Sequence, residues 1–153
     1  MKINLNVNGQ AHTLDVDAST PLIYILRNDL GLKGVKLGCG LEQCGACMVI
    51  VDGKAEFSCS SPVGGFEGKA ITTVEGLGSP DNPHPVQQAF IDEGAAQCGY
   101  CIPGIVISTK ALLDTNPEPD DEAIFAALAD HLCRCGTHNR ILKAIRRAAK
   151  EVQ

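Results

Sequence analysis

Hydrophobic and polar residues alternate at the start of the chain, which is the pattern of a strand with one buried face. Residues 3–7 read Ile-Asn-Leu-Asn-Val, and the Asn8-Gly9 pair that follows is a strong signal for a two-residue hairpin turn. The pattern therefore predicts a hairpin, with Leu14 and Val16 on its returning strand.

A helical pattern comes next. Thr20 is a favourable helix cap, and Pro21 suits the first helical position. Apolar residues then recur at helical spacing as far as Leu30, and Gly31 is a typical stop signal. The sequence therefore predicts a helix from Pro21 to Leu30.

A second hairpin is predicted after this helix. Residues 48–51 form an apolar strand, Asp52-Gly53 marks the turn, and residues 55–58 return from it. Residues 71–74 are a candidate last strand. Two hairpins with one helix across them predict a β-grasp arrangement, whose strand order the sequence leaves open.

The second half of the chain has a different pattern. Residues 76–83 are rich in Gly, Pro, Ser and Asn, and helical periodicity dominates beyond them. The predicted fold class is α+β: a β-grasp domain over 1–76, a connector over 77–83 and a four-helix bundle over 84–153. The apolar faces of its helices are Val86, Ala89 and Phe90, then Ile105, Leu112 and Leu113, then Ile124, Ala127, Leu128 and Leu132, and last Ile141, Leu142, Ile145, Ala148, Ala149 and Val152.

Composition and charge narrow the function. The chain has 153 residues and a formal net charge of −5, which argues against nucleic-acid binding because phosphate contacts need concentrated Lys and Arg. No apolar run approaches membrane-spanning length. The N-terminus already reads as a strand rather than a secretion signal. We therefore expect the chain to fold in the cytoplasm with reduced thiols, which disfavours disulfides.

Eight cysteines carry the candidate chemistry, and four of them lie in the first half. Their spacing, C-x4-C-x2-C…C, is that of a plant-type [2Fe–2S] ferredoxin site. Gly38, Gly40 and Gly45 let the backbone wrap closely around a compact cluster. A zinc site and buried inert cysteines are the alternatives, although zinc sites typically use two closely spaced pairs. The four residues are Cys39, Cys44, Cys47 and Cys59.

The other four cysteines form a C-x2-C pair and a C-x-C pair in the second half. Both pairs fall at the ends of predicted helices, so one bundle can gather four ligands near its tip. This pattern is less specific by itself, and zinc or a redox dithiol are alternatives. The dithiol leaves the C-x-C pair unexplained. The four residues are Cys98, Cys101, Cys133 and Cys135.

Together these motifs resemble the small iron–sulfur subunit of the molybdenum hydroxylases, the family of xanthine oxidase and aldehyde oxidoreductase. The resemblance spans about residues 3–150. Its motifs are Gly38-Cys39-Gly40, Cys44-Gly45-Ala46-Cys47, His84-Pro85-Val86-Gln87, Gln97-Cys98-Gly99-Tyr100-Cys101 and Leu132-Cys133-Arg134-Cys135-Gly136.

The resemblance implies a ferredoxin-like β-grasp domain followed by a four-helix bundle. It implies two [2Fe–2S] clusters, one on each set of four cysteines. It also implies a separate large subunit that binds molybdopterin, in a cytosine dinucleotide form, nearer to the second cluster. By position, Gln97 matches the glutamine that hydrogen-bonds the pterin, and Cys135 matches the ligand that also approaches it. A helix-capping or solvated amide is the alternative for Gln97.

The implied role is electron transfer from molybdopterin to an external cytochrome or flavin subunit. The resemblance implies no catalytic residue on this chain. It also allows association with a membrane-bound electron acceptor. The motifs are most similar to those of bacterial nicotinate- and isoquinoline-type dehydrogenases, so an N-heteroaromatic substrate such as nicotinate is expected. An aldehyde-oxidising member is the first alternative. A free-standing ferredoxin-type carrier and a zinc-stabilised interaction module are the others.

Histidines and basic residues complete the candidates. None of His12, His84, His131 and His138 is needed as a ligand, because both cysteine sets are complete. His84 is expected to start a helix. The basic residues at positions 140–150 are expected on the solvated face of the last helix.

Overall fold

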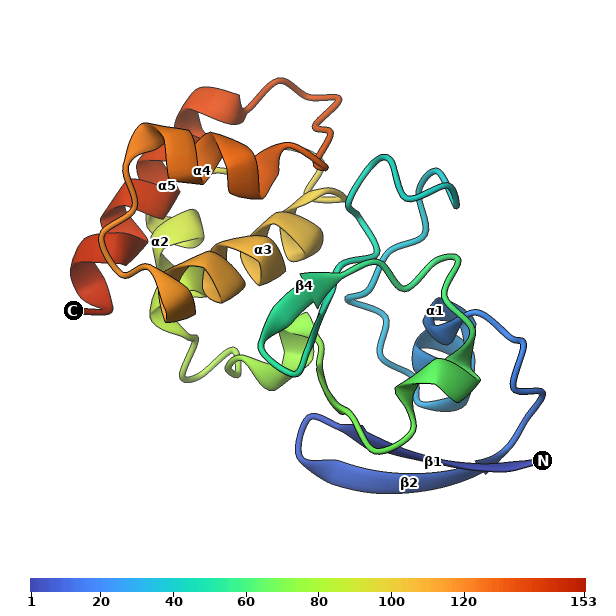
Figure 1. Cartoon of the computed structure of the whole chain (residues 1–153). Coiled ribbons are helices and arrows are strands. Elements are labelled where there is room, and N and C mark those ends of the chain that lie inside the picture. The colour runs from blue at the N-terminus through green and yellow to red at the C-terminus, as the bar shows by residue number, and fades with distance from the viewer.

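The computed structural model describes all residues from Met1 to Gln153, and its two halves lie side by side (Figure 1). The first half is built on a five-stranded mixed sheet with strand order β2-β1-β5-β3-β4. β1 pairs parallel with β5, and the other pairings are antiparallel. The strands are β1 (Lys2–Val7), β2 (Gln10–Asp15), β3 (Val49–Val51), β4 (Lys54–Glu56) and β5 (Ala70–Thr72).

Both predicted hairpins are confirmed. Asn8 and Gly9 have φ values of 52° and 77°, and Asp52 and Gly53 have 48° and 85°. Left-handed backbone at both central positions is what the favoured two-residue hairpin turn requires. The strands are slightly shorter than expected, since β2 ends before Val16.

The predicted first helix is present but short and irregular. An α-helical turn, α1 (Leu22–Tyr24), leads into a π-helical segment, η1 (Ile25–Asp29). The prediction that Thr20 caps this helix is wrong, because no side chain caps it and Pro21 is extended. The Thr20 carbonyl instead accepts a hydrogen bond from the Val63 N–H at 2.8 Å. Tertiary backbone pairing therefore sets where the helix begins.

Fifteen buried residues, nearly all aliphatic, form the core of the first half. Ile3, Leu5 and Val7 enter it from β1, which confirms the alternation read from the sequence. Cys47 and Cys59 belong to the same core. Two short 3-10 segments, η2 (Val63–Phe66) and η3 (Val74–Gly76), flank β5.

The second half is a bundle of four helices with its own core of thirteen buried residues, as the periodicity predicted. One position was wrongly predicted: Leu132 lies beyond α4 and is 63% exposed, because that helix ends at Leu128. The helix α3 ends at Thr115, shortly before Pro117, a residue type that cannot continue a helix. The helices are α2 (Pro85–Asp92), α3 (Ile102–Thr115), α4 (Asp121–Leu128) and α5 (His138–Glu151).

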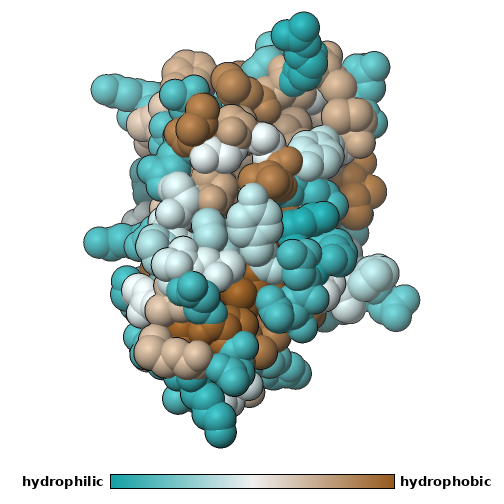
Figure 2. All heavy atoms as spheres, turned by 90° about the vertical axis from the view of Figure 1, so that its right-hand side faces the viewer, coloured by the Kyte–Doolittle hydropathy of each residue, from teal (hydrophilic) through white to brown (hydrophobic).

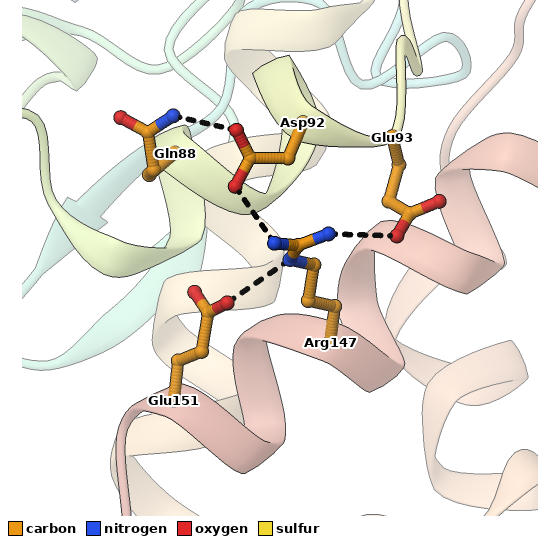
Figure 3. A network of polar contacts seen from close by, with 5 residues as sticks. All are labelled: Gln88, Asp92, Glu93, Arg147 and Glu151. Atoms are coloured by element: carbon orange, nitrogen blue, oxygen red, sulfur yellow. Dashed lines mark hydrogen bonds and ion pairs between the residues drawn. The ribbon is translucent and has the colours of Figure 1, made fainter.

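Ion pairs join α2 to α5 on the solvated side of the bundle. The Arg147 guanidinium contacts Asp92 at 3.1 Å, Glu93 at 3.2 Å and Glu151 at 3.0 Å, and Gln88 extends the network (Figure 3). All five basic residues of α5 are exposed, which confirms the expected solvated face.

A small third core joins the two halves. Met48 and Ile50 of the sheet pack with Ile107, whose side chain is 1% exposed, from the middle of α3. In Figure 1, α3 lies against the hairpin formed by β3 and β4. The helix that follows Cys101 is therefore fixed against the strand that follows Cys47.

Figure 2 shows the side of the molecule that lies at the right in Figure 1. On this side, hydrophobic residues form separate groups among hydrophilic ones. None of the helices combines the length and the apolar character needed to span a lipid bilayer.

Candidate functional site

The first four cysteines come together as two pairs of thiols. Cys39 and Cys44 are neighbours in the loop between η1 and β3, where Cys39 is exposed. Cys47 and Cys59 are neighbours within the first core. All four thiols are free. The structure thus places the four residues as two pairs, and their role as one ligand set stays a prediction.

Backbone amides surround the exposed thiol of this set. The N–H groups of Leu41 and Gln43 donate to Cys39 Sγ at 3.2 and 3.3 Å. These hydrogen bonds lower the pKa of Cys39 to about 7. The Cys39 N–H in turn donates to Cys44 Sγ at 3.4 Å. The loop therefore favours thiolate, the form that binds metal.

Burial has the opposite effect on the inner pair, because it raises the pKa of Cys47 to about 11. A buried thiolate next to Cys59 is unfavourable in the absence of a compensating positive charge. Metal binding at this pair must therefore release protons and compensate for the burial of the charge.

Glycine is favoured at two positions of the loop, for a different structural reason at each. A Cβ at Gly38 would lie 2.5 Å from Cys44 Sγ, so a side chain there would obstruct the thiols. Gly45 has a φ of 75°, in the left-handed region that favours glycine. Glu42 is also left-handed, with a φ of 56°, at the tip of the loop. The close approach expected from the glycine-rich sequence is therefore present.

The second four cysteines lie between helix ends. Cys101 directly precedes α3, and its thiol neighbours that of Cys133 in the α4–α5 loop, which also contains Cys135. Cys133 Sγ lies 3.5 Å from the Thr137 hydroxyl oxygen. The charge of Cys98 contributes to raising the pKa of Cys101, so Cys98 lies near the same site. Burial raises the pKa of Cys101 to about 12, so this set also contains a thiol that needs a cation.

Nowhere in the chain are three or more His, Cys, Asp or Glu side chains placed to hold one metal ion. The thiols are instead placed in pairs, Cys39 with Cys44, Cys47 with Cys59 and Cys101 with Cys133.

The two cysteine sets are direct neighbours. The Leu132 N–H, next to Cys133, donates to the Cys44 carbonyl at 3.1 Å. The Tyr100 hydroxyl, between Cys98 and Cys101, donates to the Leu37 carbonyl at 2.6 Å. Sequence reasoning missed both contacts, because neither residue type signals such a partner.

The structure shows whether Gln97 and His84 take part in the start of a helix. Gln97 is exposed, and since no side chain caps α3, the helix-capping alternative for this residue is wrong. The His84 Nδ1 accepts from the Val86 N–H at 3.1 Å and starts α2, as expected.

His131 lies beside Gly45 of the first cysteine loop and two residues before Cys133. Its Nε2 lies 2.6 Å from Ser108 Oγ, and its Nδ1 is buried without a hydrogen-bond partner. Burial lowers the pKa of His131 to about 4, so the ring is neutral near neutral pH.

Known proteins share both halves of this arrangement. Residues 5–69 match the 2Fe-2S iron-sulfur cluster binding domain, and residues 73–146 match a [2Fe-2S] binding domain. One of the nicotinate dehydrogenase subunits of Pseudomonas putida is 60% identical over 97% of this chain and 94% of its own length. The alpha chain of isoquinoline 1-oxidoreductase from Brevundimonas diminuta is 45% identical over 97% of this chain and 98% of its own length.

A solved structure has the same fold. The aldehyde oxidoreductase of Desulfovibrio gigas superposes with a TM-score of 0.95 at 42% identity, over 99% of this chain and 17% of that one. The same unit thus occurs as a separate subunit in some relatives and as part of a longer chain in another. The chain belongs to the family of small [2Fe–2S] iron–sulfur subunits of the molybdenum hydroxylases.

Proposed function

We propose that this chain transfers electrons from a molybdopterin centre on a large subunit, through two [2Fe–2S] clusters, to an external acceptor. The observation that carries the proposal is the pair of complete four-thiol sets, joined by the hydrogen bond from Leu132 to Cys44. A free-standing ferredoxin needs only the first set.

The thiol ligands and the amide groups around them suit a two-iron cluster at each set. Four thiols with amide donors directed at sulfur match the ligands and the hydrogen bonding of [2Fe–2S] sites. When bound, the clusters supply one-electron redox chemistry, while the protein supplies position and electrostatics. We assign the first cluster to residues 1–76 and the second to 84–153, with 77–83 as the connector. The ligands are Cys39, Cys44, Cys47 and Cys59, then Cys98, Cys101, Cys133 and Cys135.

The chain itself provides a short bonded connection between the sets. Cys133 is covalently joined to Leu132, whose N–H donates to the carbonyl of Cys44. The Tyr100 hydroxyl gives a second connection through the Leu37 carbonyl, two residues before Cys39. Neither connection requires a group from another chain.

The face that meets the large subunit is assigned to the second set. The exposed Gln97 amide can donate and accept at once, which suits a pterin edge. Cys135, partly exposed, is assigned as the ligand that also approaches the pterin. We place the molybdopterin, as a cytosine dinucleotide, on the large subunit.

An apolar groove of about 720 Å³ begins beside Gln97 and extends this face. Ala96 lines it together with Ile91 and Phe90 of α2 and Ile102 of α3. Ile91 is 66% exposed, so the groove presents apolar surface that favours a protein contact.

We infer that the substrate is an N-heteroaromatic such as nicotinate, since this chain is 60% identical to a subunit of a nicotinate dehydrogenase. An aldehyde is the alternative, which the likeness to aldehyde oxidoreductase supports. The acceptor is a cytochrome or a flavin subunit, which can be membrane-bound, and cluster assembly takes place in the cytoplasm.

The first test is an EPR spectrum of the natively purified, partially reduced complex. Two distinct [2Fe–2S] signals with a molybdenum signal are expected. One cluster signal without molybdenum would instead identify a simple ferredoxin-type carrier. Stoichiometric zinc without iron would identify an interaction module. Turnover with nicotinate, isoquinoline and an aldehyde then separates the substrate classes.

Two substitutions test the assigned residues. Cys44→Ser should disturb the signal of the first cluster and leave the second intact. Gln97→Ala should leave both signals unchanged but slow reduction of the clusters by substrate, or weaken binding of the large subunit. Unchanged turnover and assembly in Gln97→Ala would refute the pterin contact.

A further inference from the structure

One histidine lies between the two cysteine loops without belonging to either ligand set. His131 follows α4, two residues before Cys133. Its Nε2 is 2.6 Å from the hydroxyl oxygen of Ser108, a residue of α3 that is 4% exposed. This hydrogen bond fixes one edge of the imidazole ring against the bundle.

The opposite edge of the ring lies on the first cysteine loop. A Cβ added to Gly45 would be closer than 3.0 Å to His131 Nδ1, and 2.7 Å from the Asp130 carbonyl oxygen. Gly45 therefore has no room for a side chain on the side that His131 occupies. The ring spans the space between Ser108 and the backbone beside Cys44.

The neighbours of His131 hold the same point of the loop. The Leu132 N–H donates to the Cys44 carbonyl at 3.1 Å. Gly104, in the first turn of α3, approaches the Gly45 carbonyl so closely that an added Cβ would overlap it. The first loop is thus held at residues 44–45 by α3 and by the segment that leads into Cys133.

Because of this geometry, the positions of the thiols depend on how the two cysteine loops are placed against each other. Cys44 and Cys133 each lie at or next to a residue of the Leu132–Cys44 hydrogen bond, so a shift of one loop against the other moves a thiol of each set. His131 and Ser108 resist that shift, because they fill the gap and connect it to a rigid helix.

We propose that His131, held by Ser108, is a positioning residue that sets the separation of the two clusters. The inference rests on the proposed function, since it concerns a cluster on each cysteine set. His131 does not ligate iron in this scheme. It acts by keeping the loop at residues 44–45 in register with the α4–α5 loop.

The test is the spin–spin splitting between the two clusters in the EPR spectrum of the fully reduced complex, because this splitting depends on their separation. His131→Ala and His131→Leu should reduce or abolish the splitting, while each cluster keeps its own g-values. His131→Gln should restore it, since its terminal amide can reach Ser108. His138→Ala, an exposed histidine near the other side of the C-x-C pair, is the matched control and should retain the splitting.

An unchanged splitting in both His131→Ala and His131→Leu would overturn the proposal. If His131→Ala does not accumulate, Ser108→Ala decides instead, and an unchanged splitting there would also overturn it. Fewer than two cluster signals in the parent protein would refute the proposed function itself. The two failures are therefore distinguishable.

Discussion

Replacing Gly45 by alanine tests the close contact between the two cysteine loops. Two costs add at this position. The φ of 75° is left-handed, which costs an L-residue about 1–2 kcal/mol. The new Cβ would also lie 2.7 Å from the Asp130 carbonyl oxygen. Overpacking of this kind costs about 1–3 kcal/mol, so Gly45→Ala should destabilise the fold by about 2–5 kcal/mol.

Gly40→Ala is the matched control. Gly40 lies in the same loop with a φ of 69°, but nothing lies within 4 Å of its added Cβ. It should therefore incur only the backbone cost of about 1–2 kcal/mol. The difference between the variants isolates the steric contribution of the contact.

The assay is thermal unfolding of the cluster-loaded protein, followed by circular dichroism and visible absorbance. A domain of this size shifts its Tm by about 2–4 °C per kcal/mol, so Gly45→Ala should melt about 2–12 °C below Gly40→Ala. Adding His131→Ala to Gly45→Ala should recover part of this loss, because the residues are in contact. Equal Tm values for the two glycine variants would refute the reasoning.

Two further predictions concern the bundle. Burial lowers the pKa of His84, so the unfolded chain takes up a proton first and stability is lost as the pH falls below about 6.5. His84→Asn keeps a cap that does not titrate, and it should lose less stability than the parent between about pH 7 and about pH 5, as measured by urea unfolding. Arg147→Met removes three exposed ion pairs, so it should lower stability more at low salt than at high salt, and more than Lys143→Met does. An equal effect of the two substitutions on urea unfolding would show that the network adds nothing.

Local chemistry made much of the fold predictable. Asn8-Gly9 and Asp52-Gly53 define hairpin turns because their own backbone preferences match the turn. The four bundle helices follow from periodicity, and α3 ends where Pro117 required. The π-helical segment η1 was not predictable, because backbone hydrogen bonds from residues 58–63 shape the chain that leads into it. The strand order depends on similarly distant pairings.

The same division holds for the site. The composition of both cysteine sets follows from spacing, since a cluster loop needs its ligands at fixed intervals. Their direct connection does not, because it depends on Leu132, Tyr100 and His131, residues common in ordinary surfaces and cores. Gly45 and Gly104 were the available signal, since neighbouring backbones that approach closely exclude side chains.

The two partners of the Leu132–Cys44 hydrogen bond are synthesised at different times. During synthesis, Cys39 to Cys59 leave the ribosome well before Leu132, so the first set can receive iron while the loop at Cys44 is still uncovered. The Leu132 N–H can bond the Cys44 carbonyl only after the α4–α5 loop has been made. Cluster delivery is therefore expected to be ordered, and a chain truncated before α4 should load its first site but release that iron more readily to a chelator.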